Sequence, residues 1–328
     1  MNQTTKVIKF GGQTLSTEPN EVENQWGTIL FEINRLLNDV ESDNLVWVVM
    51  SATLGTTRRL DQIASLLHTG NDGSAQEELL RILTEHRDAG LILTNQHQSD
   101  VNSAFIRLTS FTKALLEEVT KKGFVPNDFL HAGILSLGER MVVELMVIPA
   151  LNDLRPHIYT AHESALRLMR ASVEGQGATM ARVNVEESVE NMKKMIGELL
   201  LYGRDTKGVI PPPRIFVMEG YIAYQQGRER PVTLGYDASD LSAVLCAHAL
   251  GTEAVLIKNI KADQPIPATL PELLIVMRRV SGSKGRLVGI AAIECAIQLG
   301  VTIVLRDPMT GDEYRITPSR VMEGVSGE

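Results

Sequence analysis

The chain has 328 residues, of which 44% are hydrophobic and 22% are charged, and its net charge at pH 7 is −8. These values are typical of a water-soluble protein with a large core, and the negative charge argues against a general nucleic-acid binder. No apolar run reaches the ~20 residues that cross a bilayer, and the polar N-terminus does not resemble a signal peptide, so we expect no membrane partner. Cys246 and Cys295 lie in apolar, helix-like surroundings, which indicates buried free thiols in a cytoplasmic protein rather than a disulfide or a metal site.

The first expected strand ends in a lysine and two glycines. Val7 and Ile8 favour a strand, Lys9 follows them, and Gly11 and Gly12 come directly after it. Glycines let backbone N–H groups approach an anion closely, and a lysine can neutralise the oxygens of a transferring phosphate. The Gly-x4-Gly-Lys spacing of a Walker loop is absent, so a solvated lysine at a strand end remains the alternative.

A strand, a helix and a second strand follow each other at the start of the chain. Residues 21–40 repeat apolar side chains at helical spacing, and the apolar run 45–50 ends in the polar loop 51–57. In a parallel strand–helix–strand unit, the loops after both strands lie at the edge of the sheet where ligands bind. Residues 56–122 then predict a helical layer that is broken at 70–74.

The later elements are predicted from the same apolar periodicity. They are helices from 135 to about 151 and over 185–202, 241–250, 270–280 and 287–299, and strands over 157–160, 214–218, 254–257, 301–305 and 313–316. Glu139 falls in the first turn of the first of these helices, where an acid also suits the helix dipole. Three consecutive prolines within 203–213 indicate a joint. We therefore expect an N-terminal lobe over 1–205 and a C-terminal lobe over 206–328 in one continuous domain.

Two further polar loops precede helices in the second half. Ser239 is a good N-cap, and Asp240, in the first turn, is suited to holding a lysine or a magnesium-bound phosphate. The loop 281–286 adds Lys284 and Arg286. Polar loops with two separated lysines suit phosphoryl transfer, in which positioning and charge neutralisation dominate. The histidines show no metal-ligand spacing, and no serine or cysteine has the glycine-elbow context of a hydrolase.

The amino-acid sequences of these loops, and their order along the chain, resemble those of the amino acid kinase family, and within it the aspartate kinases. The similar segments, between residue 6 and about residue 305, are Lys9-Phe10-Gly11-Gly12-Gln13-Thr14, Val48-Val49-Met50-Ser51-Ala52 with Gly55-Thr56-Thr57, Leu137-Gly138-Glu139-Arg140, Gly220-Tyr221-Ile222, and Thr233-Leu234-Gly235 with Ser239-Asp240-Leu241-Ser242-Ala243. The resemblance implies a three-layer αβα sandwich with an eight-stranded, mainly parallel sheet. It implies a homodimeric kinase that transfers the γ-phosphoryl group of ATP, with Mg²⁺, to the carboxylate of an amino acid. The N-terminal lobe would bind this acceptor, and the C-terminal lobe would bind ATP.

The same resemblance assigns roles to individual residues. Lys9 and Lys284 would be catalytic cations, and Asp240 would orient the lysines. The acceptor-binding residues would be Ser51, Thr56, Glu139, Tyr236, Asp237 and Ser239. The ATP-binding residues would be Lys9, Gly11, Gly12, Gly235, Lys258, Asn259, Lys284 and Arg286. No side chain is expected to ligate magnesium directly.

Some positions depart from the family pattern. Tyr236 stands where aspartate kinases have an arginine, and a phenol cannot replace its bidentate, charged grip on a carboxylate. Asp237 stands where they have a glycine, and Lys258-Asn259-Ile260-Lys261-Ala262 replaces Thr-Asp-Val-Asp-Gly. The sequence ends at Glu328 without the paired regulatory modules, so we expect no feedback control through such modules.

Three hypotheses remain open at this point. The first is an active kinase of the aspartate-kinase type that acts on aspartate or a related amino acid. Asp237 could prefer a cationic or amide-bearing group on that acceptor, as in a specialised biosynthetic pathway. The second, motivated by Lys258 and Asn259, is a kinase-fold protein that binds a nucleotide or metabolite without phosphoryl transfer. The third is a partner subunit of an oligomeric kinase.

Overall fold

The computed structural model of the chain describes most of the sequence. The described residues are 5–38, 45–121, 128–154, 160–162, 167–174, 177–205, 215–228, 230–235, 237–261, 264–280 and 286–318. The predicted joint at 203–213 and the first three residues of the predicted strand 157–160 lie mostly or wholly outside these stretches. A membrane-spanning helix needs a long apolar run, and none of the helices in the described stretches offers one.

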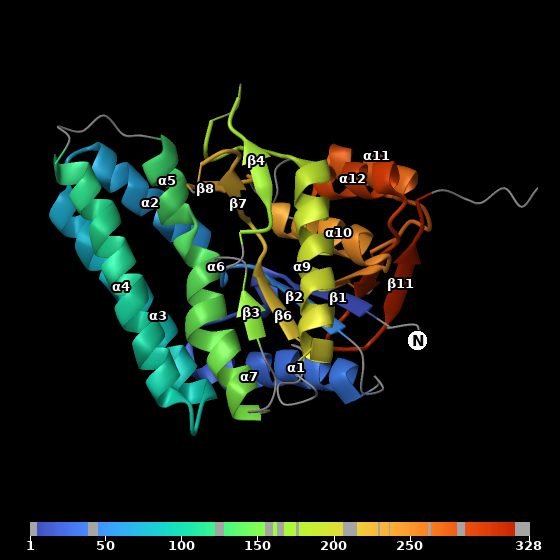
Figure 1. Cartoon of the computed structure of the whole chain (residues 1–328), viewed down its shortest axis with the longest axis horizontal. Helices are drawn as coiled ribbons and strands as arrows, with labels where there is room; N and C mark the ends of the chain where they lie inside the picture. Colours follow the sequence, from blue (N-terminus) through green and yellow to red (C-terminus); the bar gives the residue numbers. More distant parts are fainter. Residues whose placement is uncertain are drawn as a thin grey trace, which may run out of the picture.

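The main sheet of the described residues has seven strands in the order β11-β10-β9-β1-β2-β6-β3 (Figure 1). The strands are β1 Thr5–Phe10, β2 Leu45–Met50, β3 Thr160–His162, β6 Ile215–Glu219, β9 Ala254–Ile257, β10 Ile303–Arg306 and β11 Glu313–Ile316. All neighbouring pairs are parallel except β10 with β11, which forms a hairpin at one edge. The mainly parallel α/β architecture is confirmed, with seven strands in the described residues where the resemblance implied eight.

The helices are distributed along the whole chain. They are α1 Pro19–Asn38, α2 Thr56–His68, α3 Asp72–Leu93, α4 Gln98–Lys121, α5 Asp128–Leu135, α6 Leu137–Met141, α7 Ile148–Leu154, α9 Val185–Asp205, α10 Ala238–Leu250, α11 Leu270–Arg279 and α12 Ile290–Leu299. Two short elements join them: a 3₁₀ turn over Gly12–Thr14 and a π-helix over Val142–Val147. In Figure 1 the blue-to-green helices α2 to α5 and the orange-to-red helices α10 to α12 lie on different sides of the strands.

Helices cover both faces of the sheet, so the molecule has three layers. Alternate residues of a strand point to opposite faces. Val7 of β1 therefore belongs to a core that it shares with α10 and α12, whereas Ile8 and Phe10 belong to a second core that they share with α1 and α2. Cys246 and Cys295 lie in the first core as buried free thiols, which confirms that prediction.

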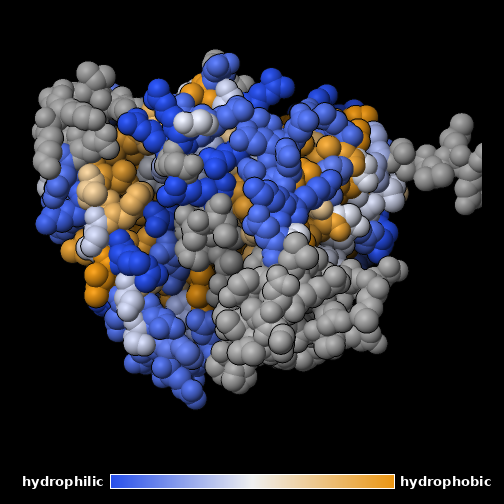
Figure 2. Space-filling model, viewed as in Figure 1, coloured by the Kyte–Doolittle hydropathy of each residue, from blue (hydrophilic) through white to orange (hydrophobic). Residues whose placement is uncertain are grey.

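Helix α9 confirms the helix that periodicity predicts over 185–202. Val189 and Met192 are buried, whereas Glu190, Lys193 and Lys194 are exposed. Figure 2 shows the outward face of this helix as largely hydrophilic. Because one face is apolar and the other is charged, α9 covers the core that Val7 faces and separates it from water.

A small second sheet lies in the middle of the chain, with the strand order β5-β4-β7-β8. Its strands are β4 Arg170–Ser172, β5 Arg182–Val183, β7 Ile222–Gln225 and β8 Pro231–Thr233. The antiparallel hairpin of β7 and β8 turns at Gly227, whose φ of 70° suits glycine. The strands β4 and β5 lie in a part of the sequence whose pattern predicts no element.

Two predicted helices differ from the observed ones. The expected helix from 135 to 151 is divided into the end of α5, α6, the π-helix and most of α7. The expected helix over 287–299 begins at Ile290, because Gly289 has extended backbone and its N–H donates to Asp240 instead of entering the helix.

Candidate active site

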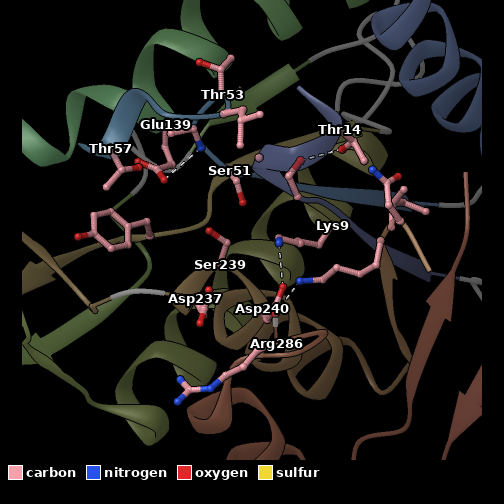
Figure 3. A pocket seen from close by; sticks show the side chains of 18 of the residues that line it. Lys9, Thr14, Ser51, Thr53, Thr57, Glu139, Asp237, Ser239, Asp240 and Arg286 are labelled. Atoms are coloured by element: carbon pink, nitrogen blue, oxygen red, sulfur yellow. Dashed lines mark hydrogen bonds and ion pairs between the residues drawn. The ribbon is translucent and has the colours of Figure 1, made fainter. Parts of the chain in front are cut away.

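A cleft of about 260 Å³ opens where β1, β2 and β9 end, at the edge of the sheet that the sequence indicates (Figure 3). Phe10, the last residue of β1, pairs with Met50 of β2 and Ile257 of β9, so the three loops that follow start side by side. The first turn of α10 also lines the cleft. Ligands bind at this edge in parallel α/β sheets because the polar loops converge there.

The loop after β1 supplies one wall of the cleft. Lys9 projects into the cleft from the strand, and Gly11 and Gly12 line it directly afterwards. A Cβ atom on Gly12 would lie 2.6 Å from the Ala52 carbonyl oxygen, so a larger residue would push the loops after β1 and β2 apart. The Thr14 hydroxyl closes this turn by donating to the Gly11 carbonyl at 2.7 Å.

Three charged side chains from separate elements form one cluster in the cleft. The Asp240 carboxylate of α10 lies 2.8 Å from the Lys9 ammonium nitrogen and accepts a hydrogen bond from Lys258 at 2.9 Å. The Gly289 N–H donates to the same oxygen as Lys258, at 3.1 Å. Lys9 and Asp240 are almost completely buried, and Lys258 is partly exposed. Because two ammonium groups share one carboxylate, the cluster carries a net positive charge beside the cleft.

Burial and mutual attraction set the pKa values of this cluster. Burial alone would raise the pKa of Asp240, but Lys258 and Lys9 outweigh it and hold the pKa well below its usual range. Burial lowers the pKa of Lys9 to about 8, because the attraction of Asp240 offsets only part of the lost hydration and Lys258 repels the charge. At pH 7 Lys9 is therefore mainly a poorly hydrated cation, which favours pairing with an incoming anion.

A sharp bend before α10 places Asp240 in this cluster. Asp237 has a φ of 63°, in the left-handed region that disfavours most residues other than glycine. Gly289 approaches this bend so closely that a Cβ atom on it would lie 2.7 Å from the Asp237 carbonyl oxygen. Burial and the nearby Asp240 charge raise the pKa of the Asp237 carboxyl group, which lines the cleft. Strained backbone of this kind gathers at functional sites.

Glu139 lies across the cleft from Asp240 (Figure 3). Its Oε1 accepts a hydrogen bond from the Ala52 N–H at 3.1 Å, whereas its Oε2 is buried without a hydrogen-bond partner among the described residues. The side chain is only 3% exposed, and burial raises its pKa to about 8. A buried carboxyl group with an unpartnered oxygen at a cleft is suited to pair with a cation of a ligand.

The loop after β2 presents hydroxyl groups both to the cleft and to the protein interior. Ser51 and Thr57 line the cleft, and in Figure 3 Ser51 lies between Glu139 and the cluster around Asp240. Thr56, which the resemblance implied as an acceptor ligand, is buried behind the cleft, with its hydroxyl 2.6 Å from the Thr53 hydroxyl. The neighbouring residue Thr57 lines the cleft instead of Thr56.

The structure brings most of the predicted site residues together. Those that line the cleft are Lys9, Gly11, Gly12, Ser51, Glu139, Asp237, Ser239, Asp240, Lys258, Asn259 and Arg286. Gly235 instead packs against the Met180 side chain, and Tyr236 and Lys284 lie outside the described residues. Within the described residues, the lysines that pair with Asp240 are Lys9 and Lys258, and the role implied for Lys284 stays a prediction.

Sequence reasoning misses several residues near the site, among them Thr57, Tyr221 and His86. Thr57 and Tyr221 line the cleft, and both stand inside segments that carry the resemblance, so their place in those segments could have indicated them. The third, His86, is fully buried in α3 and lies 3.0 Å from the Thr53 hydroxyl. Nothing in the sequence marks it, because it stands alone in the middle of a helical pattern.

No protein-family model matches the chain, and no curated protein matches it significantly. Its fold does match solved structures of aspartokinases. E. coli aspartokinase III in complex with aspartate and ADP aligns with a TM-score of 0.65 and 16% identity, over 95% of this chain and 64% of that chain. The aspartate kinase of Clostridium acetobutylicum aligns with a TM-score of 0.65 and 14% identity, over 98% of this chain and 64% of that chain.

A second structure of E. coli aspartokinase III, in complex with lysine and aspartate, aligns with a TM-score of 0.64 and 17% identity, over 92% of this chain and 62% of that chain. The chain thus spans less than two thirds of the length of these enzymes. At such identities the likeness shows the fold, while activity depends on the site itself. The chain therefore has the amino acid kinase fold, which it shares with these aspartokinases.

Proposed function

We propose that the chain is a small-molecule kinase that transfers the γ-phosphoryl group of MgATP to the carboxylate of aspartate or a related amino acid. The observation that carries this proposal is the cluster of Lys9, Asp240 and Lys258 at the carboxyl ends of β1 and β9. Phosphoryl transfer needs positioned positive charge more than a protein nucleophile. The complex of E. coli aspartokinase III with aspartate and ADP is consistent with such a reaction on this fold.

The proposed reaction balances without a proton from the protein. An oxygen of the ionised acceptor carboxylate attacks the γ-phosphorus and forms the new P–O bond of an acyl phosphate. The bond from that phosphorus to the β–γ bridging oxygen breaks, and its electron pair leaves with ADP. Lys9 and Lys258 neutralise negative charge that moves between these oxygens, and Asp240 keeps the two ammonium groups from repelling each other.

Glu139 is the group that we assign to the acceptor's ammonium group. Its buried Oε2 has no hydrogen-bond partner among the described residues, so an ammonium group would satisfy it and would favour the ionised carboxylate over the protonated form. Ser51, Thr57 and Ser239 offer hydroxyl groups to the polar parts of the same ligand. Asp237 adds a second carboxyl group to the lining, which favours an acceptor with a cationic or amide-bearing group.

The donor chemistry of the cleft fits a magnesium ion that is held mainly by phosphate oxygens and water. Among the described residues, no three histidine, cysteine, aspartate or glutamate side chains are grouped to hold a metal. Asp240 is occupied by two lysines, so phosphate oxygens and water would supply the ligands of such an ion. When bound with ATP, the ion would neutralise phosphate charge.

An ADP-release screen over amino acids and their derivatives tests the proposal. We expect ADP release that depends on a carboxylate-bearing acceptor, and a fall in kcat of about 10²- to 10³-fold for Lys9→Met, which removes the charge but keeps the chain length. Lys194→Met on the exposed face of α9 is the matched control and should retain wild-type rates. Absence of ADP release with every acceptor would contradict the kinase proposal.

The alternative of a binding protein without phosphoryl transfer predicts a different result. It predicts that ATP binds with measurable affinity in calorimetry while no acceptor supports turnover. Under that alternative, Lys9→Met would leave most of the ATP affinity in place, because the lysine would serve no transition state. Titration and turnover measured on the same preparation separate the two functions.

A further inference from the structure

A chain of hydrogen bonds runs from the loop after β2 into the interior of α3. His86 of α3 is fully buried, and its Nδ1 lies 2.8 Å from the Ile82 carbonyl oxygen. A carbonyl oxygen only accepts hydrogen bonds, so Nδ1 carries the ring proton and Nε2 is an acceptor. The Thr53 hydroxyl, 3.0 Å from Nε2, therefore donates to the ring and accepts from the Thr56 hydroxyl at 2.6 Å.

The histidine ring is neutral in this arrangement. Burial lowers the pKa of His86 to about 4, so at pH 7 its Nε2 keeps the lone pair that Thr53 needs. Thr53 and Thr56 are both only 3% exposed, so water does not readily replace either partner. A buried hydroxyl group that loses its hydrogen-bond partner is left unsatisfied, which costs free energy. These hydrogen bonds therefore attach the loop after β2 firmly to α3.

The loop that these hydrogen bonds attach to α3 is the one of residues 51–55, which line the cleft. Ala52 donates its N–H to Glu139 at 3.1 Å, and Leu54 donates its N–H to the Leu15 carbonyl at 3.1 Å. Thr53 lies between these two residues and also lines the cleft, while its hydroxyl group is bonded to Thr56 and His86. Gly55, which follows, has a φ of 84°, so the backbone at this end of the loop has the freedom of glycine.

We propose that His86 is a positioning residue for the acceptor, which acts through Thr53 by fixing the loop of residues 51–55. In the fixed loop, Ser51 lines the cleft and the Ala52 N–H holds the Glu139 carboxyl group in place. A loop that is ordered before binding loses less entropy when the ligand arrives, and small displacements of binding groups weaken reaction strongly. This inference rests on the proposed function, because it assigns the loop to the acceptor.

Isosteric variants of Thr53 test the attachment. Thr53→Val removes the hydroxyl group, Thr53→Ser keeps it, and His86→Leu removes the acceptor if the valine variant folds poorly. Thr112→Val is the matched control, because the Thr112 hydroxyl is also buried but has no hydrogen-bond partner among the described residues. Wild type and all four variants are measured as the full chain.

Amide hydrogen exchange reports the loop without any need for activity. We expect the amides of Ala52 and Leu54 to exchange about tenfold faster or more in Thr53→Val and His86→Leu, while amides of the central strand β1 keep wild-type rates. Thr53→Ser and Thr112→Val should match wild type. Unchanged exchange of Ala52 and Leu54 in both loss variants would overturn the inference.

Steady-state kinetics then connect the loop to the acceptor. We expect the KM for the acceptor to rise about tenfold or more in Thr53→Val while the KM for ATP changes less than twofold, and Thr53→Ser should restore the acceptor KM. Equal rises in both KM values would overturn the positioning role in favour of a general structural one. If wild type releases no ADP with any acceptor, the proposed function fails, whereas the exchange experiment still tests the attachment of the loop.

Discussion

Asp240 holds two ammonium groups that would otherwise repel each other inside the protein. Replacing it with asparagine keeps the shape and removes the charge, which leaves Lys9 buried beside Lys258 without an anion. We expect Asp240→Asn to lower the free energy of unfolding by about 3 kcal/mol, as measured by urea denaturation. The double variant Asp240→Asn, Lys258→Met should recover part of this loss, because it removes one of the two unpaired charges. A double variant no more stable than the single one would contradict this charge balance.

Glu139 makes stability depend on pH in the opposite direction from an ordinary carboxylate. Burial raises its pKa from 4.5 to about 8, so the folded state binds this proton more tightly than the unfolded state does. The stabilisation that Glu139 gives to the folded state is therefore complete below pH 4.5 and is lost as the pH rises toward 8. Glu139→Gln cannot ionise, so its stability relative to wild type should rise across this window, by at most about 1.4 kcal/mol per pH unit.

Denaturation of wild type and Glu139→Gln at several pH values across this window measures that difference. A difference that stays constant with pH would show that Glu139 does not hold its proton in the folded state. The same variant should bind the acceptor weakly, because an amide does not attract an ammonium group as a carboxylate does. Greater stability together with weaker binding is the pattern expected of a group kept for function.

At the scale of elements, the π-helix over Val142–Val147 explains why one predicted helix is divided. Gly90 of α3 lies against the Leu145 carbonyl of this segment so closely that any side chain would collide with it. The sequence shows only apolar periodicity here, and periodicity does not reveal where a carbonyl leaves the regular hydrogen-bond ladder. The element was therefore predictable as helical, but its interruption next to Glu139 was not.

This close approach predicts different outcomes for two glycines of the same helix. Gly90→Ala should lower the free energy of unfolding by about 2–3 kcal/mol, because the new methyl group meets backbone that cannot rotate away. Gly73→Ala, also in α3, meets no atom within 4 Å and should be neutral or stabilising by up to about 1 kcal/mol. Thermal or chemical denaturation measures both. Equal effects of the two substitutions would contradict the packing of α3 on the π-helix.

The central strands were predictable because both of their faces are buried. β2 is an unbroken apolar run, and β6 is apolar over 215–218 before the buried Glu219. The polar loop after β2 lines the cleft, as the sequence pattern suggests. The pairing of Lys258 with Asp240 was not predictable, because a sequence does not tell where a long side chain ends. The link from Thr53 to His86 was equally hidden, since it joins residues that are 33 positions apart.

At the scale of the whole molecule, the cleft is built from residues of both predicted lobes. Strand β6 follows the predicted lobe boundary at residue 205, yet it lies between β2 and β3 in a single sheet. Lys9 comes from the first part of the chain, and Asp240 and Lys258 come from the second. Phosphoryl transfer at this cluster would therefore depend on the folding of the whole sheet, and neither predicted lobe contains the complete site.

The most direct test of the central claim is hydroxylamine trapping of the product in reactions with ATP and the preferred amino acid. An acyl phosphate reacts with hydroxylamine to give a hydroxamate, whereas a phosphate ester does not. We expect hydroxamate to form in step with ADP for wild type, and to fall at least about 10²-fold for Lys9→Met. ADP release without hydroxamate, or equal hydroxamate from Lys9→Met, would contradict transfer to a carboxylate beside the Lys9, Asp240 and Lys258 cluster.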